Sequence, residues 1–325
     1  MFDILSLIPG KKKRTHSGWY TFNAICCSHR GHRTDTRNRG GLKIDGHTWV
    51  MHCFNCGFST SFNLGKTITP KTRQFMIWCG VDSDQVQRWS LESLQHRDLL
   101  DTLIPEKNSI FINFKHKGLP KGELLDVANP KHQPYVDYLT KRKIDLSTYS
   151  FYVNPDGVNR EKYGIIVPYL FRNKNVGSTI RFIDNKIPKF LNDQQPGYIF
   201  NFDKQKSDWE ICIATEGIFD AISIDGVALM HDDISNEQAI VLAQLNKTII
   251  VVPDFDKTGL TLIDRALELG YKVSLPNWEP GIKDVNDAVV KYGKLPTLLS
   301  IIEAASNSKI KIEMRKKQIL KGIND

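Results

Sequence analysis

Residues 207–305 alternate short apolar runs with longer amphipathic runs, and this pattern restricts the possible folds more than any other feature of the chain. The apolar runs have the length of strands and lack polar alternation, which is typical of parallel strands buried on both faces. The segments between them have the spacing of helices. The predicted strands are residues 210–215, 227–230, 248–253 and 271–275. We therefore predict an α/β domain with a parallel sheet flanked by helices.

Acidic residues stand directly after two of these predicted strands. Glu216 follows the first strand, and Asp254 and Asp256 follow the third. Ligands of open α/β sheets bind beyond the carboxyl ends of the strands, so we expect these carboxylates to converge there. Such a group favours Mg²⁺, which takes carboxylates, waters and phosphates, and two such ions can serve one phosphoryl transfer. Each acid taken alone also fits the N-cap of a helix.

The cysteines indicate a metal site near the N-terminus. Four of them cluster early in the chain, and we expect no export signal, so metal binding is favoured over disulfides. Cys53-x-x-Cys56, followed by Gly57, has the spacing of a zinc knuckle, and Cys26-x-x-His29 has the spacing of a second one. The adjacent Cys27 and the nearby His32 leave the first pair open. The predicted ligands of one structural zinc ion are Cys26, His29, Cys53 and Cys56.

Residues 41–52, between the two pairs, alternate apolar and polar side chains around Asp45-Gly46. This pattern predicts a hairpin, and a small sheet between paired knuckles makes a zinc ribbon. Trp49 lies on this hairpin, where core and surface positions are equally compatible with the pattern. A module of this size needs a staple to fold, and zinc supplies one.

Positive charge is concentrated in the same N-terminal module. Residues 1–70 contain 10 Lys and Arg against 3 Asp and Glu, whereas the rest of the chain is nearly balanced. This asymmetry favours a polyanionic partner such as nucleic acid, with a solvated basic face as the alternative. The candidate contacts to nucleic acid are Arg30, Arg33 and Arg37.

These motifs together resemble one known family. Glu216-Gly217 and Asp254-x-Asp256-x-x-Gly259, each after a strand, resemble the TOPRIM signature of primases, topoisomerases and some nucleases. Arg181 followed by Lys189-Phe190-Leu191-Asn192, together with the paired knuckles, resembles the basic segment and zinc ribbon of bacterial and phage primases. Lys283-Asp284-Val285-Asn286-Asp287 resembles the late acidic motif of T-even bacteriophage DNA primases.

The resemblance implies a DNA-dependent RNA polymerase that makes short RNA primers for lagging-strand synthesis. It implies magnesium at Glu216, Asp254 and Asp256, and a catalytic cluster completed by Asp284 and Asp287. It also implies that template or nucleotide phosphates contact three further residues, Arg181, Lys189 and Asn192.

The partners implied by the resemblance are single-stranded DNA, ribonucleoside triphosphates, a replicative hexameric helicase and a single-stranded DNA-binding protein. The expected location is the cytoplasm, that of the host for a phage protein. Two other functions compete: a TOPRIM nuclease, and a zinc-ribbon adaptor that binds single-stranded DNA without catalysis.

The 325 residues suggest more than one domain, and no apolar run approaches the ~20 residues of a membrane span. A mixed α+β subdomain is expected before the parallel sheet. The predicted parts are a zinc ribbon (1–68), a helical connector and linker (69–134), the N-terminal part of the polymerase domain (135–206), the TOPRIM domain (207–305) and a basic tail (306–325).

Overall fold

The computed structural model describes residues 2–46, 48–95, 113–184, 186–256 and 259–324. The chain forms two compact units, each assembled from segments that are distant in the sequence. The first consists of Met1–Asn113, Ile234–Ile249 and Arg265–Tyr271, and the second of Phe114–Asp233, Ile250–Asp264 and Lys272–Asp325. The division into five parts stays a prediction. Among the described residues, no helix has the length and apolar character that a membrane crossing requires.

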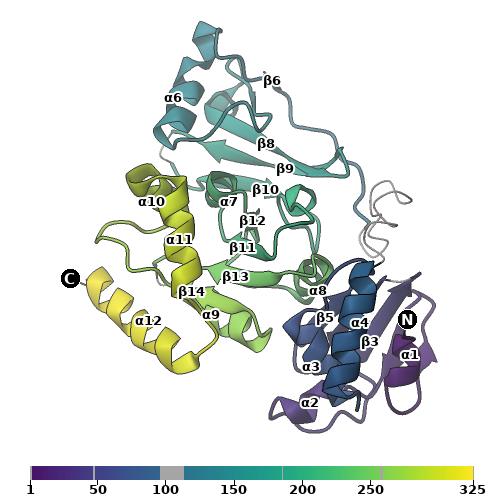
Figure 1. The fold of residues 1–325 in the computed structure, drawn as a ribbon. Coiled ribbons are helices and arrows are strands. Elements are labelled where there is room, and N and C mark those ends of the chain that lie inside the picture. The colour runs from purple at the N-terminus through teal and green to yellow at the C-terminus, as the bar shows by residue number, and fades with distance from the viewer. Residues whose placement is uncertain (1, 47, 96–112, 185, 257–258, 325) are drawn as a thin grey trace. The chain divides into compact units, whose positions relative to one another are not determined.

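The first unit is built on a five-stranded antiparallel sheet whose strands follow chain order (Figure 1). β3 and β4 pair from Gly40 with Cys53 to Asp45 with Thr48, which confirms the hairpin predicted between the knuckles. Trp49 is buried on this hairpin and belongs to the core. The strands are β1 (Lys13–Arg14), β2 (Tyr20–Phe22), β3 (Gly40–Asp45), β4 (Thr48–Cys53) and β5 (Ser59–Phe62).

Helices from two distant parts of the sequence complete the core of this unit. The N-terminal ones are α1 (Ile4–Leu7), α2 (Cys26–His29), α3 (Pro70–Trp78) and α4 (Ser83–Gln95). Helix α8 (Asn236–Gln244), which begins with a capping box at Ser235, packs against β5. The Ser59 hydroxyl donates to the Ala239 carbonyl at 3.5 Å. Asp82 caps α4 by accepting the backbone N–H of Asp84 at 2.9 Å.

The second unit contains an antiparallel sheet with the strand order β10-β9-β8-β7-β6. Its strands are β6 (Glu123–Leu124), β7 (Tyr152–Val153), β8 (Gly164–Phe171), β9 (Lys174–Phe182) and β10 (Phe190–Asp193), and helix α6 (Gln133–Lys141) lies between β6 and β7 in sequence. Residues 101–112 of the predicted linker lie outside the described residues.

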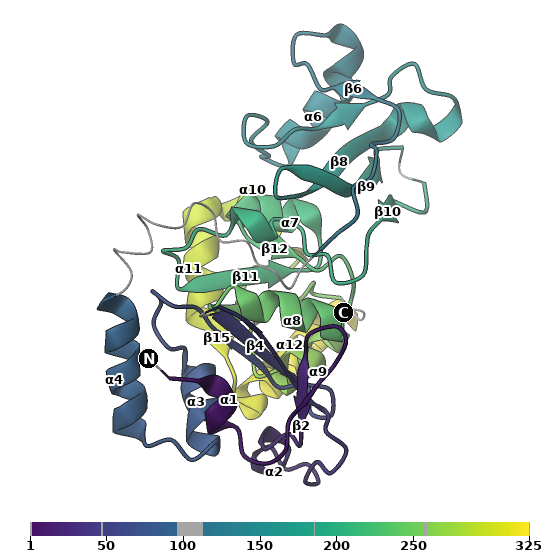
Figure 2. The ribbon, with the colours of Figure 1, turned by 90° about the vertical axis from the view of Figure 1, so that its right-hand side faces the viewer.

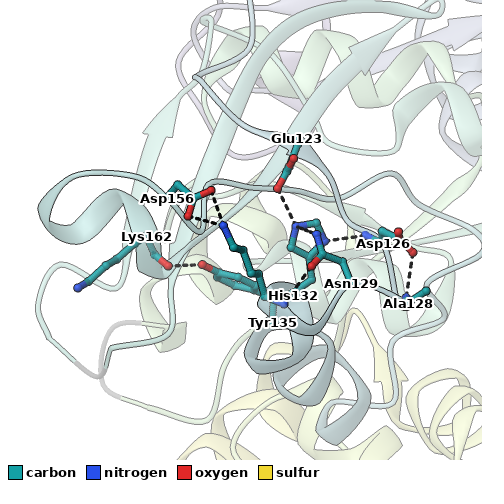
Figure 3. A network of polar contacts seen from close by, with 9 residues as sticks. Glu123, Asp126, Ala128, Asn129, His132, Tyr135, Asp156 and Lys162 are labelled. Atoms are coloured by element: carbon teal, nitrogen blue, oxygen red, sulfur yellow. Dashed lines mark hydrogen bonds and ion pairs between the residues drawn. The ribbon is translucent and has the colours of Figure 1, made fainter.

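A buried histidine fixes the start of α6 (Figure 3). His132 is only 1% exposed. Its Nδ1 accepts the backbone N–H of Asp126 at 2.9 Å, and its Nε2 lies 2.9 Å from the Glu123 carboxylate. Nε2 therefore carries the proton that Glu123 accepts. Within the same helix, the Tyr135 hydroxyl donates to the Lys162 carbonyl. These contacts hold α6 against the loops of the antiparallel sheet.

The second sheet of this unit has the order β12-β11-β13-β14-β15. β11 runs parallel to β12 and β13 parallel to β14, as predicted, whereas the edge strand β15 is antiparallel to β14. The two residues of β15 are too short for a sequence pattern to reveal. The strands are β11 (Ile211–Thr215), β12 (Val227–Ala228), β13 (Thr248–Val252), β14 (Lys272–Ser274) and β15 (Ala305–Ser306).

Helices α7 (Ile218–Ile224) and α10 (Val285–Tyr292) pack side by side, and α11 (Lys294–Ala304) contacts both α7 and β14 (Figure 2). The remaining helices are α9 (Gly259–Glu268) and α12 (Lys309–Asn324). The predicted fold class is confirmed: the protein is a mixed α/β protein with several sheets, one of them largely parallel, and with cysteines gathered near the N-terminus.

Candidate functional site

The ends of two neighbouring strands bring the predicted acids together. Glu216 follows β11 directly, and Asp254 follows β13 after a single proline. The Glu216 carboxylate accepts the backbone N–H of Asp254 at 3.0 Å, so these two strand ends are in direct contact. The carboxylates therefore occupy the position at which α/β sheets bind ligands.

Gly259 is required by the closeness of these groups. A Cβ atom at this position would lie 2.6 Å from Glu216 Oε1 and 2.4 Å from the Asp254 carbonyl oxygen, so no side chain fits. The backbone N–H of Gly259 donates to Asp256 Oδ1 at 2.8 Å. The glycine of the Asp254-x-Asp256-x-x-Gly259 motif thus lets the first turn of α9 approach the acids.

Burial and mutual repulsion disfavour the charged forms of these acids. Burial raises the pKa of Glu216 to about 7. It also raises the pKa of Asp254 to about 8, and the charges of Glu216 and Asp284 add to the effect. A carboxylate whose pKa is raised by both burial and like charges is typical of a functional site.

The late acidic motif approaches the same place. Asp284 caps α10 by accepting the backbone N–H of Asp287 at 2.7 Å, and burial raises its pKa. The backbone N–H of Phe255 donates to the Lys283 carbonyl at 2.7 Å, which links this loop to the loop of Asp254. Asp287 is exposed, and its charge contributes to the raised pKa of Asp254.

Asp220 belongs to this acidic group, and our sequence analysis missed it. It lies on α7, is 7% exposed, and accepts the backbone N–H of Asn286 at 2.7 Å. Burial raises its pKa well above the ordinary value, and Asp284 and Asp254 raise it further. A signal was present in the sequence, because Asp220 is the one charged residue of the otherwise apolar or small run Ile218–Ile224.

Arg142, at the end of α6, faces the acidic group through Asn286. Arg142 Nη1 donates to Asn286 Oδ1 at 2.9 Å, and Asn286 Nδ2 donates to the Arg142 carbonyl at 2.9 Å and to Ser223 Oγ at 2.8 Å. The Arg142 charge lowers the pKa values of Asp220 and Asp284, although burial outweighs this effect. Sequence patterns gave no signal for this network, because its members lie on three separate helices or their caps.

The predicted basic segment is divided between packing and surface positions. The Arg181 guanidinium lies over the rings of Phe190 and Tyr138, 4.5 and 5.6 Å from their centroids. Asn192 Oδ1 accepts the hydroxyls of Thr179 at 2.6 Å and Tyr169 at 3.3 Å. Lys189 is exposed. Of the predicted trio, Asn192 is thus engaged in holding β10 to the neighbouring strands.

Four buried thiols form the predicted metal centre of the first unit. The Sγ atoms of Cys26, Cys27, Cys53 and Cys56 all lie within 4.8 Å of one another. Sγ of Cys27 lies 3.5 Å from that of Cys53, and Sγ of Cys56 lies 3.6 Å from that of Cys26. Four sulfurs around one zinc ion are ~3.8 Å apart, given Zn–S bonds of ~2.3 Å in a tetrahedron. The four thiols therefore fit one zinc ion.

This geometry corrects the predicted ligand set, because Cys27 occupies the place expected for His29. The His29 ring instead stacks on Trp78, with centroids 5.1 Å apart and planes 5° from parallel. Asn55 Nδ2 donates to Cys27 Sγ at 3.2 Å, which orients that sulfur toward the group. His32, the other alternative, is exposed and outside the group.

In the part of the chain that the structure describes, no three acidic side chains lie as close together as these four thiols.

Arg30, one of the predicted nucleic-acid contacts, is used within the fold. Its Nη1 donates to the Cys56 carbonyl at 2.6 Å, and its Nη2 donates to the Glu268 carbonyl. Arg33 and Arg37 remain exposed.

No family model and no curated protein sequence matches this chain. Among solved structures, the DnaG primase catalytic domain bound to ssDNA is similar with a TM-score of 0.48 and 16% identity, covering 59% of this chain and 78% of that chain. A DNA primase domain from Pseudomonas aeruginosa gives 0.44 and 17%, covering 55% and 74%. The primase fragment of the bacteriophage T7 primase-helicase protein gives 0.41 and 12%, covering 83% and 96%. At this level of similarity, function must be inferred from the residues of the chain itself.

We predict that Asp254→Asn raises the melting temperature of the metal-free protein near pH 8. The raised pKa means that the folded protein binds more protons than the unfolded chain between the ordinary value of 3.8 and about 8. Stability therefore falls as the pH rises through this window, and the uncharged amide removes that loss. Thermal melting near pH 5 and near pH 8 measures the effect, which should be larger at the higher pH. Asp264→Asn, at an exposed position on α9, is the matched control. Equal melting of the Asp254 variant and wild type at both pH values would contradict the prediction.

We predict that Cys27→Ser abolishes stoichiometric zinc binding and that His29→Ala retains it. The serine hydroxyl is a poor replacement for a thiolate ligand, whereas His29 lies outside the sulfur group. Zinc per chain, measured by elemental analysis after dialysis, checks both variants. Retention of zinc by the Cys27 variant together with its loss from the His29 variant would restore the ligand set expected from the sequence.

We predict that Asn286→Ala lowers the free energy of unfolding by about 2–4 kcal/mol, because it removes the side-chain partner of the Arg142 guanidinium, the Arg142 carbonyl and the Ser223 hydroxyl. Urea unfolding followed by circular dichroism measures this loss. Asn277→Ala, at an exposed position, should change the unfolding midpoint little. Coincident unfolding curves for the two variants would show that the network does not stabilise the fold.

Proposed function

We propose that this protein is a DNA primase, a DNA-dependent RNA polymerase that synthesises short RNA primers on single-stranded DNA by nucleotidyl transfer. The observation that carries the proposal is the convergence of acids at the ends of β11 and β13, where the half-buried Glu216 carboxylate accepts the backbone N–H of Asp254. The order of motifs in the sequence and the thiol group that fits zinc support it.

The acids are proposed to hold the divalent cations that this chemistry uses. Glu216, Asp254 and Asp256 would bind magnesium, and Asp284 and Asp287 would complete the acidic group. Magnesium, when bound, supplies the charge that stabilises a developing alkoxide and a departing pyrophosphate. Burial, and then repulsion from neighbouring acids, raises the pKa values of Glu216 and Asp254. These raised values support the role, because a bound cation would offset both effects.

Basic side chains are proposed to bind the substrates. Arg181 and Lys189 would contact template or nucleotide phosphates, and Asn192 would act by holding β10 in place. Arg33 and Arg37 would contact single-stranded DNA from the zinc-containing unit. Arg30 would support them by its bond to the Cys56 carbonyl.

The proposed partners follow from the same function. The substrates are single-stranded DNA and ribonucleoside triphosphates. A replicative hexameric helicase and a single-stranded DNA-binding protein are proposed as protein partners at the replication fork. One similar structure is described as a primase bound to ssDNA and another as part of a primase-helicase protein, which supports these assignments.

A primer-synthesis assay tests the proposal. The full-length, zinc-loaded protein is incubated with single-stranded DNA, labelled ribonucleotides and magnesium, with and without the helicase. We expect short RNA products from wild type and from the control Asp264→Asn. Asp254→Asn should lose synthesis by at least about 100-fold, because it removes a carboxylate that would hold the catalytic cation.

Other outcomes would identify the competing functions. Absence of RNA from wild-type protein that still binds single-stranded DNA, even with helicase present, would favour an adaptor without catalysis. Shortened DNA that requires Asp254 would favour a nuclease. Either result contradicts the primase proposal.

A further inference from the structure

We propose that residues 33–39 and Asn55 form a phosphate-binding site, assembled around the buried carboxylate of Asp35 and attached to the zinc knuckle. The site adds a phosphate-binding role to the proposed function. It rests on that function for one point only, namely that the phosphate belongs to nucleic acid or to a nucleotide. It lies in the first unit, on the side of the thiol group formed by Cys27 and Asn55.

Asp35 folds the loop around itself. This residue is 1% exposed, and its carboxylate accepts the backbone N–H groups of Ala24 at 2.9 Å, Arg37 at 2.9 Å and Arg39 at 2.7 Å. It also accepts Arg39 Nε at 3.1 Å. A carboxylate with this many donors is fully engaged as an acceptor, so its charge is balanced inside the loop.

The remaining arginines of the loop keep their charge available. Arg33 and Arg37 are exposed, and neither has an acidic partner in the part of the chain that the structure describes. They border an open cavity of about 490 Å³. Its lining is His32, Arg33, Thr34, Thr36, Arg37, Arg39 and Asn55.

The composition of this lining favours phosphate as the ligand. It contains guanidinium groups, which form bidentate bonds with phosphate oxygens, and two threonine hydroxyls, which can donate to them. None of the lining residues is Phe, Tyr or Trp, and no carboxylate lines the cavity. We therefore assign the site to the phosphates of the ligand.

The wall of the cavity is part of the zinc knuckle. Asn55 lies between Cys53 and Cys56, and its amide donates to Cys27 Sγ at 3.2 Å. The backbone N–H of Phe54 donates to the Arg39 carbonyl at 2.9 Å, which ties the knuckle to the end of the arginine loop. Zinc therefore shapes the phosphate site by fixing this knuckle, in addition to stabilising the ribbon.

The test is the salt dependence of binding to a labelled oligothymidylate, measured by fluorescence anisotropy without magnesium or nucleotides. For Arg33→Ala/Arg37→Ala, affinity at low salt should fall at least about tenfold. The magnitude of the slope of log K against log salt should fall by about 1.4, because each neutralised phosphate of a single strand contributes about 0.7. Arg33→Lys/Arg37→Lys keeps both charges and should preserve most of the slope.

Arg73→Ala/Arg88→Ala is the matched control, because it removes the same charge from α3 and α4 of the same unit. It should leave the slope within about 0.3 of wild type, if Arg33 and Arg37 act as local contacts rather than through net charge. An equal fall in slope for both double variants would overturn the proposal in favour of a diffuse electrostatic effect.

Competition with sodium tripolyphosphate and with ATP distinguishes the two sources of phosphate. If Arg33→Ala/Arg37→Ala changes the salt slope of DNA binding but leaves the affinities for tripolyphosphate and ATP unchanged, the site binds the nucleic-acid backbone. If the same variant binds tripolyphosphate and ATP more weakly but keeps the wild-type salt slope for DNA, the site binds the triphosphate of a nucleotide. If neither changes, the site does not exist.

This test is separable from that of the proposed function. Asp254→Asn should bind the oligothymidylate with the wild-type slope, because Asp254 lies in the other unit and binding requires no catalysis. A chain that makes no RNA but shows the predicted change for Arg33→Ala/Arg37→Ala would refute primase activity and leave the phosphate site intact.

Discussion

Repulsion between the carboxylates gathered beyond β11 and β13 is the main physical constraint on the second unit. Removing a charge from water without a partner is costly. Burial accordingly raises the pKa of both Glu216 and Asp254. Asp220, on α7, is itself buried. Helix capping accounts for only part of this arrangement. Asp284 and Asp220 accept backbone N–H groups in the first turn of α10, whereas Glu216 accepts the backbone N–H of Asp254 in a loop. A cation at this acidic group, as we propose, would offset the repulsion between its charges.

The rest of the second unit limits how far these acids can separate. Gly259 lets the first turn of α9 lie against Glu216, and Asn286 joins α10 to Arg142 at the end of α6. Helix α6 is in turn held at its start by the buried His132. The antiparallel sheet and the parallel sheet are therefore connected by polar contacts that end at the acidic group, so a change in α6 alters the support of that group.

The sequence revealed those parts of the site that local rules determine. Glu216 and Asp254 were predictable because acids after buried strands must reach the same edge of a sheet. Asp220 and Arg142 were not identified, because their roles arise from contacts across 66 and 144 residues of sequence with Asn286. Spacing alone favoured His29 as a zinc ligand, and only the packing of Trp78 from α3 shows why its ring is directed elsewhere. The same limit applies to the fold. Apolar runs in the sequence predicted the parallel strands, but no local pattern predicted that α8 packs in the first unit.

Buried carboxylates occur in both units, and the donors around them separate structural acids from functional ones. Burial alone would raise the pKa of Asp35, but hydrogen bonds from Ala24, Arg37 and Arg39 outweigh it and lower that pKa overall. Glu216 receives a single backbone donor and its pKa is raised. Because Asp35 is satisfied within its own loop, its role is to shape the surface that Arg33 and Arg37 present. Because Glu216 and its neighbours lack such a set of donors, they fit the cation site that we propose for them.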